Sequence, residues 1–408
     1  ADTMQDAEKG PANGQEDFIL RVNSCLTPME TIHNASILCR GGCIQAMGGY
    51  SALRVLEDIP CIDMSDCQAI PGLIDTHLHG SGGFAAMNAD VDCDLNGISQ
   101  VLAMHGVTSF VMTLVAAPID KMVRVAGALA SACESGLNGA TPLGVHFEGP
   151  YLSLEKAGAQ SARAIHAIDM VEARDLMQAV NGKGRTMTFA PELENSGKLI
   201  EMLLENGIVP SMGHSMASEK HVLWAMAAGA TRCTHLFNGM PPLDQRQSSL
   251  TSVALTDDRL TIELIADGVH VHPRMIDLAC RCKPRRGVVG ISDATQGAGL
   301  KDGVYHLGED EVEINEGVCR RISDGKLAGS CLTLDQALRN LAEFGSLPKS
   351  DVLACFTMNP AESLQLTDRG IIQPGKRADI VVVDDDWQIQ MTIVNGRVVY
   401  DRRGVTDA

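Results

Sequence analysis

Two patterns of hydrophobic positions divide the chain. From Phe18 to about Asp63, short apolar segments such as FILRVNSCL and ASILCRGGCIQAMGG are separated by Gly and Asn, without helical spacing. The C-terminal segments GKRADIVVVDD and IQMTIVNGRVVY have the same pattern, with a turn signal at Asn395-Gly396. Short apolar runs bounded by turn residues are typical of β-strands. Both ends of the chain are therefore predicted to form strands.

The middle of the chain alternates between strand-like and helix-like patterns. The runs GVTSFVMTLV and PLGVHFEGP are short and apolar, whereas the segment PIDKMVRVAGALASACESG between them has the spacing of an amphipathic helix. Repeated βα alternation predicts parallel strands joined by crossover helices, and we expect an α/β fold of the (β/α)8 TIM-barrel type. An open doubly wound sheet fits the same alternation, so barrel closure is an expectation that the pattern does not decide.

These patterns predict three parts of the chain. Residues 1–16 are polar and acidic, and we expect a disordered leader there. Residues 17–69 and 368–408 are expected to form one small β-sandwich domain from both chain ends. Residues 70–367 are expected to form the barrel.

Composition narrows the range of partners. The formal net charge is −18, which disfavours nucleic acid and anionic membranes as partners. An anionic small-molecule substrate would need a locally basic pocket. No apolar run is long enough to span a bilayer. The thirteen cysteines form no paired CxxC units, so we expect reduced thiols and a cytoplasmic location.

Five segments share one design, in which an apolar run ends and a candidate metal ligand follows. Parallel barrel strands place such residues together at their carboxyl ends, where active sites of this fold are built. Imidazole nitrogens and carboxylate oxygens suit Zn²⁺, Fe²⁺ or Mn²⁺. The segments are GLIDTHLH with His77 and His79, GVHFEGP with Glu148, VPSMGH with His214, CTH with His235, and GISD with Asp293.

Each of these residues also has a structural explanation when taken alone. His77 and His79 alternate along a strand and so point to one face, which packing can also produce. His214 follows a glycine, as turn and cap residues do, and Asp293 could cap a following helix. The catalytic interpretation depends on all five segments falling at strand ends of successive βα units.

The motif series resembles that of the N-acetylglucosamine-6-phosphate deacetylases, a family within the amidohydrolase superfamily. The segments PGLIDTHLHG, FEGPYL, GHS, THLFNGM and SDA follow in order, and GSCLTLDQA, NPAE and GKRADIVVVD extend the match. PGxIDxHxH alone is shared across amidohydrolases. The combination of HxEGP, THLFN and ADGxH is specific to the deacetylase branch.

This resemblance implies a role for each candidate. Glu148, His214 and His235 would bind the main divalent metal, and His77 and His79 would hold a second ion, so one or two ions per subunit are expected. Asp293 corresponds to the catalytic acid/base. The implied reaction is hydrolysis of the acetamide of N-acetylglucosamine 6-phosphate in amino-sugar catabolism.

The resemblance also implies a substrate site, with one departure from the family. Asn238 and the backbone N–H of Gly239 would contact the phosphate, and His270 would lie on the phosphate side. Arg246 would reach the active site of the neighbouring subunit in a homodimer. Gln160 stands where many relatives have a substrate-contacting histidine, and a glutamine can donate a hydrogen bond but cannot carry a proton charge.

Two other classes of function remain open on the sequence. One is an amidohydrolase for a different amide, such as a D-aminoacylase or a dihydroorotase-like enzyme, which would not need the anion-binding set of Asn238, Arg246 and His270. The other is a non-catalytic barrel that serves as a scaffold. Such a scaffold would be expected to lack Asp293 or some of the metal ligands, and this chain has them all.

Overall fold

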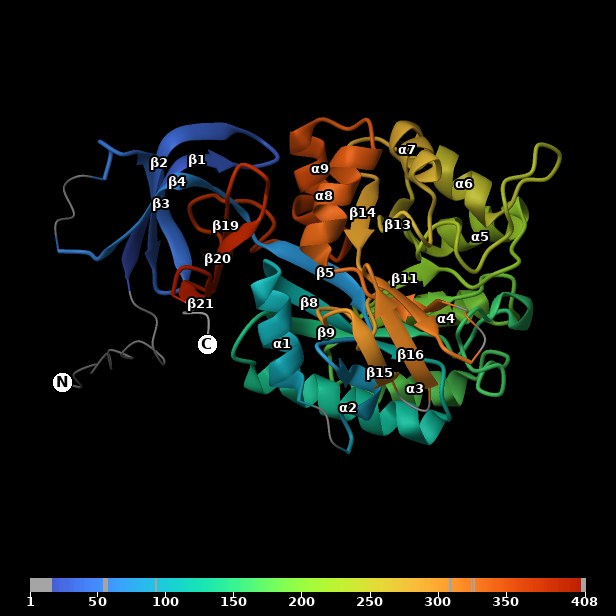
Figure 1. Cartoon of the computed structure of the whole chain (residues 1–408). Coiled ribbons are helices and arrows are strands. Elements are labelled where there is room, and N and C mark those ends of the chain that lie inside the picture. The colour runs from blue at the N-terminus through green and yellow to red at the C-terminus, as the bar shows by residue number, and fades with distance from the viewer. Residues whose placement is uncertain are drawn as a thin grey trace, which may run out of the picture.

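The protein consists of a barrel and a separate sheet, as Figure 1 shows. The computed structural model describes residues 17–53, 58–91, 94–307, 310–323, 325 and 327–404, so the leader predicted for residues 1–16 lies outside the described residues. In Figure 1 the first strands, in blue, and the last strands, in red, lie together on the left, and the barrel lies on the right. The two ends of the chain thus meet in one part of the structure.

Eight parallel strands form the barrel wall in the order β14-β13-β12-β11-β10-β9-β8-β5. The wall comes together where β14 meets β5, through a parallel bridge between Leu78 and Ala294. The predicted barrel-type α/β fold is confirmed. The strands are β5 (Leu73–Leu78), β8 (Val107–Val115), β9 (Thr141–Glu148), β10 (Gly184–Phe189), β11 (Val209–Met212), β12 (Arg232–Cys233), β13 (Thr261–Ile265) and β14 (Val288–Ile291).

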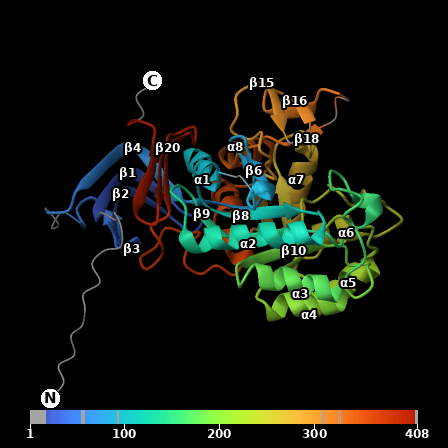
Figure 2. The same ribbon diagram turned by 90° about the horizontal axis from the view of Figure 1, so that it is seen from below.

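Helices connect these strands and surround the wall, as Figures 1 and 2 show. They are α1 (Leu95–Met104), α2 (Ile119–Ser135), α3 (Met170–Ala179), α4 (Ser196–Glu205), α5 (Glu219–Ala228), α6 (Leu250–Thr256), α7 (Pro273–Cys282), α8 (Leu334–Phe344), α9 (Lys349–Phe356) and α10 (Met358–Ser363). Two short 3-10 turns, η1 (Ala86–Asn88) and η2 (Leu154–Lys156), lie in the loops.

Helix α2 illustrates why these segments fold as they do. Its buried residues Met122, Val125, Ala126, Leu129 and Ala130 recur at the three- and four-residue spacing that forms one apolar face. Strand β9 is apolar along most of its length, and seven of its eight residues are buried. Continuous burial is expected for parallel strands that are covered on both faces.

The chain-end sheet has seven strands in the order β21-β20-β19-β4-β1-β2-β3. Most neighbours pair antiparallel, whereas β1 and β4 pair in parallel. Alternate residues of these strands pack into a core of their own, which includes Leu20, Ile37 and Ile380. The strands are β1 (Phe18–Leu26), β2 (Thr31–Arg40), β3 (Cys43–Gly49), β4 (Cys61–Pro71), β19 (Ile380–Val383), β20 (Ile389–Val394) and β21 (Arg397–Asp401).

A four-stranded antiparallel sheet interrupts the barrel sequence between β14 and α8. In Figure 2 its strands project at the top of the view, above α7. The sequence patterns did not single it out. Its strands are β15 (Gly303–Leu307), β16 (Asp310–Asn315), β17 (Val318–Arg321) and β18 (Leu327–Ser330), and a two-stranded ribbon of β6 (Gly80–Ser81) and β7 (Phe84–Ala85) lies after β5.

Among the helices that the structure describes, none combines the length and the apolar character needed to cross a membrane.

Candidate metal and active site

The candidate ligands lie at the carboxyl ends of five barrel strands. His77 lies in β5 and His79 directly follows that strand, while Glu148 is the last residue of β9. The other three each lie two residues beyond a strand end, namely His214 after β11, His235 after β12 and Asp293 after β14. The structure therefore brings all six residues to one mouth of the barrel, as their pattern in the sequence predicted.

Glu148, His214 and His235 form the first of two ligand clusters. The Oε1 atom of Glu148 lies 2.9 Å from Nε2 of His214 and 2.9 Å from Nε2 of His235. The two Nε2 atoms lie 3.1 Å apart. All three residues are buried. One carboxylate and two imidazoles that converge in this way form a donor set suited to a divalent transition metal.

His77, His79 and Asp293 form the second cluster. The Oδ1 atom of Asp293 lies 3.1 Å from Nε2 of His79 and 3.3 Å from Nε2 of His77. Glu148 lies between the clusters, because its Oε2 atom is 3.4 Å from Nε2 of His79 while Oε1 faces the first cluster. Two adjacent metal positions with Glu148 between them are compatible with this arrangement.

The backbone at three of these ligands adopts the left-handed conformation. The φ angles are 45° at His214, 27° at His235 and 47° at Asp293. Residues with a side chain rarely adopt this region, at a cost of about 1–3 kcal/mol each, and such residues cluster at functional sites. The bends that aim these three side chains into the mouth are therefore a structural feature that the sequence motifs did not reveal.

Hydrogen bonds at Nδ1 orient the rings of two histidines so that their Nε2 atoms face the mouth. The Nδ1–H of His214 donates to the carbonyl oxygen of Lys156 at 2.7 Å, and Nδ1 of His77 lies 3.0 Å from Oε2 of Glu263. Among the residues that the structure describes, none forms a hydrogen bond with the buried Nε2 of His77. A neutral imidazole that donates through Nδ1 offers a lone pair at Nε2, which is the form that binds metal. The residues present thus fit a divalent cation.

The charges in the mouth are set by burial and by mutual contacts. Burial alone would raise the pKa of the Glu148 carboxyl, but hydrogen bonds with His214 and His235 outweigh this effect and hold its pKa well below the usual range. Burial likewise disfavours a charged His77, yet the Asp293 and Glu263 carboxylates raise its pKa well above the usual value. Glu148 is therefore a carboxylate, complementary to a cation.

Gln160 contacts the first cluster directly. Its side-chain oxygen accepts a hydrogen bond from the backbone N–H of Ala116 at 2.8 Å, and its Nε2 donates to Oε2 of Glu148 at 2.7 Å. Because the amide oxygen is bound by a backbone donor, the orientation of the amide is defined. Both ends of the amide are engaged with the protein, and a role toward a substrate stays a prediction.

Three residues of the predicted anion-binding set lie near the mouth. Asn238 follows His235 closely, and its Nδ2 donates to the carbonyl oxygen of Leu236 at 3.3 Å. Gly239 has a φ angle of 62°, and a Cβ atom there would lie 2.9 Å from Nδ1 of His214, so a side chain would be strained. Burial lowers the pKa of His270, but its hydrogen bond with Asp267 and the charge of Asp293 outweigh this effect and raise it.

Arg246 lies apart from this set, in the exposed loop of residues 241–248. Its backbone N–H donates to Oδ1 of Asp244. Within the described part of the chain, its guanidinium has no hydrogen bond or ion pair. The structure of one chain therefore does not bring Arg246 to its own clusters.

Three buried residues lie behind the ligands. The sequence motifs missed Arg232 and Glu263, and they contained His146, the histidine of HxEGP, without assigning it a role. Glu263 of β13 and Arg232 of β12 form an ion pair inside the barrel. His146 of β9 lies between the hydroxyls of Thr113 and Thr188, and its ring packs against that of His77 at 4.6 Å between centroids. The sequence signal that could have revealed Glu263 is a charged residue inside an otherwise apolar strand, in the segment TIELI.

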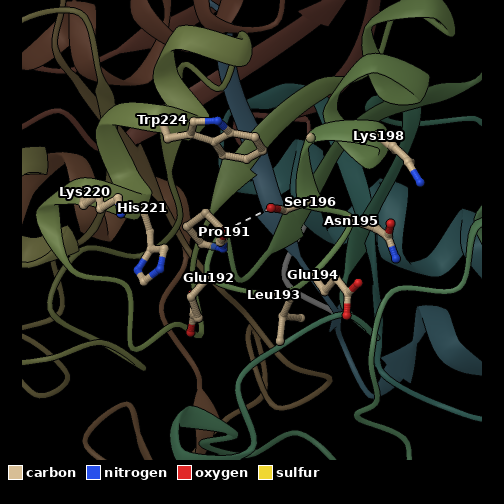
Figure 3. Close-up of a pocket in the computed structure, with 11 residues that line it drawn as sticks. Pro191, Glu192, Leu193, Glu194, Asn195, Ser196, Lys198, Lys220, His221 and Trp224 are labelled. Carbon is tan, nitrogen blue, oxygen red and sulfur yellow. Dashed lines mark hydrogen bonds between the residues drawn. The ribbon is translucent and has the colours of Figure 1, made fainter.

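A pocket of about 600 Å³ lies outside both clusters, and Figure 3 shows its lining. It is formed by the loop after β10, the start of α4, and Trp224 of α5. Glu192 in this loop accepts hydrogen bonds from the hydroxyl of Ser215 at 2.7 Å and from the backbone N–H of Met216 at 2.6 Å. These hydrogen bonds fix the loop to the two residues that follow His214.

Comparison with known proteins agrees with this geometry. The sequence profile of the Amidohydrolase family matches residues 69–399. An N-acetylglucosamine-6-phosphate deacetylase of Vibrio furnissii is 36% identical over 361 residues, which cover 88% of this chain and 89% of the relative. An N-acetylgalactosamine-6-phosphate deacetylase of Escherichia coli O157:H7 is 34% identical over 353 residues, which cover 85% and 92%.

A solved structure is similar over nearly the whole chain. It is a mutant of the N-acetyl-D-glucosamine-6-phosphate deacetylase of Mycobacterium smegmatis in complex with N-acetyl-D-glucosamine-6-phosphate. The TM-score is 0.85 at 31% identity, and the match covers 94% of this chain and 99% of the other. The chain belongs to the amidohydrolase family, within its branch of N-acetylglucosamine-6-phosphate deacetylases.

Proposed function

We propose that this protein hydrolyses the acetamide of N-acetylglucosamine 6-phosphate to glucosamine 6-phosphate and acetate, as a step in amino-sugar catabolism. The observation that carries the proposal is the convergence of Glu148, His214, His235 and Asp293 in one barrel mouth. The relatives that are 36% and 31% identical bear the name of this reaction. A scaffold barrel would have no need for these buried ligands.

The metal requirement rests on Glu148, His214 and His235, which we propose as ligands of the main ion. His77 and His79 would hold a second ion together with Asp293. Bound Zn²⁺, Fe²⁺ or Mn²⁺ would supply polarisation of the carbonyl and activation of a water molecule. Gln160 would keep the Glu148 carboxylate oriented toward the first position, through its hydrogen bond to Oε2.

Asp293 is proposed as the group that carries the proton. Its carboxylate faces both His77 and His79 at the mouth, so it can reach a water molecule near the metal positions. It would accept a proton from the attacking water and return one to the amine as the carbon–nitrogen bond breaks. Water and the amide are thereby converted to acetate and the amine, without a further reactant.

The phosphate would be bound by His270 and by other hydrogen-bond donors near the barrel mouth. His270, the amide of Asn238 and the backbone N–H of Gly239 would form a donor set for an anion. Local donors are needed because the net charge of −18 repels a phosphate dianion. The use of this set distinguishes the proposal from a D-aminoacylase-like or dihydroorotase-like enzyme.

Arg246 is proposed to complete the phosphate site of a second copy of the chain, in a homodimer. Its unpaired guanidinium extends from an exposed loop, and a guanidinium can bind phosphate through two N–H donors. Exposed apolar side chains in this loop and in and just before α5, whose first residue Glu219 donates its backbone N–H to Ser248, support an interface there. Met216, Leu223, Trp224 and Leu243 are each between 40% and 51% exposed.

The substitution Arg246→Ala tests this shared site. We expect KM for the phosphorylated sugar to rise about tenfold or more with a smaller change in kcat, because phosphate binding is largely common to ground and transition states. Arg259→Ala is the matched control, since that exposed arginine pairs with Asp257 in its own turn. Mixing Arg246→Ala and Asp293→Asn subunits should restore part of the activity. A monomer that is fully active would contradict the shared site.

Release of acetate from N-acetylglucosamine 6-phosphate tests the function itself. The unphosphorylated sugar should be a poorer substrate by roughly two powers of ten in kcat/KM, because the phosphate contacts are lost. N-acetylgalactosamine 6-phosphate, an N-acetyl-D-amino acid and dihydroorotate complete the panel. Equal rates with and without the phosphate, or a preference for one of the last two compounds, would overturn the proposal.

A cytoplasmic location is proposed as well, supported by the free thiol of each cysteine that the structure describes.

A further inference from the structure

Behind His77 lies an ion pair that is fully enclosed by the barrel. The Nη2 atom of Arg232 lies 2.5 Å from Oε1 of Glu263, and their side chains are 1% and 2% exposed. The same guanidinium donates to the hydroxyls of Thr76 at 3.2 Å and Ser363 at 2.8 Å. The arginine is held on several sides, and Glu263 is its one carboxylate partner among the described residues.

The second oxygen of Glu263 faces the metal-site residues. Its Oε2 atom lies 3.0 Å from Nδ1 of His77 and accepts a hydrogen bond from the backbone N–H of His235 at 3.3 Å. Beside a permanently charged guanidinium Glu263 is a carboxylate, which only accepts hydrogen bonds. Nδ1 of His77 must therefore carry the hydrogen in this contact.

The other ring nitrogen of His77 points into the second cluster. Nε2 lies 3.3 Å from Oδ1 of Asp293 and 3.8 Å from Oε1 of Glu148. It is buried, and no residue of the described chain forms a hydrogen bond with it. In the neutral ring whose Nδ1 is protonated, Nε2 has a lone pair directed at this cluster.

A purely structural role explains the ion pair poorly. Buried ion pairs are weak contributors to stability, because desolvation of both charges offsets their attraction. Apolar side chains of similar volume would fill the same space. Carboxylates that hold the second nitrogen of a histidine ligand are, in contrast, a common means of fixing the ring and its protonation.

We propose that Glu263, held by Arg232, is a positioning residue that fixes His77 in the form whose Nε2 accepts a divalent cation. The cation position concerned is the cluster of His77, His79 and Asp293. The proposal rests on the proposed metal dependence, but it concerns residues to which the motif series assigns no role. According to this proposal, the affinity of the second cation position depends on the hydrogen bond between Glu263 and His77, although Glu263 is not itself a ligand.

The substitution Glu263→Gln tests the proposal by exchanging one oxygen for an NH2 group. The guanidinium of Arg232 only donates, so the amide must turn its oxygen toward Arg232. The NH2 group then faces Nδ1 of His77, which becomes an acceptor, and the ring hydrogen moves to Nε2. A protonated Nε2 cannot bind a metal. The affinity for the second ion should fall about 10- to 100-fold, while the first ion stays bound.

Metal content and calorimetric titration with Zn²⁺ give the readout, without substrate. The wild-type chain should retain about two ions, one for each cluster, and Glu263→Gln about one. The matched control is Glu192→Gln. This carboxylate accepts hydrogen bonds from Ser215 and Met216 beside the proposed ligand His214. Among the described residues it forms no hydrogen bond or ion pair with an imidazole, so two ions should remain.

The double variant Arg232→Met with Glu263→Gln guards against a folding defect in the single variant. Without the guanidinium, the amide oxygen is free to face His77 Nδ1 and the His235 N–H, and the second ion should return. Two ions in Glu263→Gln, one ion in the wild-type chain, or one ion in a folded double variant would each overturn the proposal. Failure of the proposed function would show separately, as absence of acetate release from a chain that binds two ions.

Discussion

The described residues include two Arg–carboxylate–His triads, which differ in the groups that surround the second nitrogen of the histidine. In the barrel mouth, Arg232 and Glu263 hold His77. Between α1 and α8, Arg339 lies 3.1 Å from Oδ2 of Asp335, whose Oδ1 lies 3.1 Å from Nδ1 of His105. In both triads the carboxylate contacts the Nδ1 atom of the ring.

The second ring nitrogen distinguishes the two triads. His77 is completely buried, and its Nε2 is directed at Asp293 and Glu148. The side chain of His105 is 29% exposed, and it belongs to neither ligand cluster of the described chain. An arginine, a carboxylate and a histidine thus face the proposed metal ligands in one place and lie away from them in the other. The surroundings of Nε2 decide the function, and the triad alone does not.

The largest effect on kcat is expected from Asp293→Asn, because Asp293 is the proposed proton carrier. The described surroundings of His105 contain no residue with this role. The amide cannot accept and return a proton, so kcat should fall by about three powers of ten or more while substrate binding is largely kept. Steady-state kinetics and equilibrium binding of the substrate check this. Asp335→Asn is the control and should leave kcat within about twofold. Near-normal turnover by Asp293→Asn would refute its role.

His214→Ala should have the next largest effect. It removes one ligand of the first cluster, and Nε2 of His214 lies 2.9 Å from Oε1 of Glu148. Affinity for the tightly bound ion should fall about 100-fold or more, and activity should fall with it. Metal analysis after dialysis measures this change. His221→Ala, which alters an exposed histidine of α5, should retain the metal. Retention of the ion by His214→Ala would remove this residue from the ligand set.

His77→Gln tests whether metal binding depends on the histidine of the first triad. Loss of its Nε2 ligand should lower the metal content from about two ions to about one. The equivalent change His105→Gln should leave the content unchanged, although both histidines pair with a carboxylate. Equal metal content in both variants, after loading with excess Zn²⁺, would mean that the His77 triad is as structural as that of His105.

The smallest effect on the reaction is expected from Asp335→Asn. This substitution should change the free energy of unfolding and leave the reaction rate almost unchanged. Burial raises the pKa of Asp335, but the contacts with His105 and Arg339 outweigh this and hold it at about 2. A carboxyl whose pKa is lowered by folding stabilises the protein above its unfolded pKa, about 4. This contribution, about 2 kcal/mol, should be lost as the pH falls from about 4 to about 2.

Denaturant unfolding at several pH values checks the Asp335 prediction. Asp335→Asn should be less stable than the wild-type chain at pH 7, and the difference should shrink toward pH 2. Its metal content should match that of the wild-type chain. A loss of metal in this variant would erase the distinction between the two triads.

The sequence predicted the barrel and the position of the candidate ligands at strand ends because both follow local rules. The helical spacing of residues 118–136 predicted a helix where α2 lies, and the ligands follow apolar runs directly. Arg232 and Glu263 are 31 positions apart and meet only because β12 and β13 are neighbours. A pair of this kind depends on strand order, which a local pattern does not contain.

One further feature depended on tertiary structure, whereas another could have been predicted from the sequence. The left-handed backbone at His214, His235 and Asp293 is maintained by the surrounding fold, since a residue with a side chain rarely adopts it without such support. The sheet of β15 to β18 had a readable signal. In β16 the buried Val312 and Ile314 alternate with exposed charged residues, which is the two-residue period of a strand.

The central claim is a metal-dependent release of acetate from N-acetylglucosamine 6-phosphate. Its most direct test is to strip the protein with a chelator and to follow acetate release while Zn²⁺ is returned in steps. The account predicts no acetate above background from the stripped protein, and recovery as the clusters of His and carboxylate ligands are filled. Undiminished acetate release by protein shown to contain no metal would contradict it.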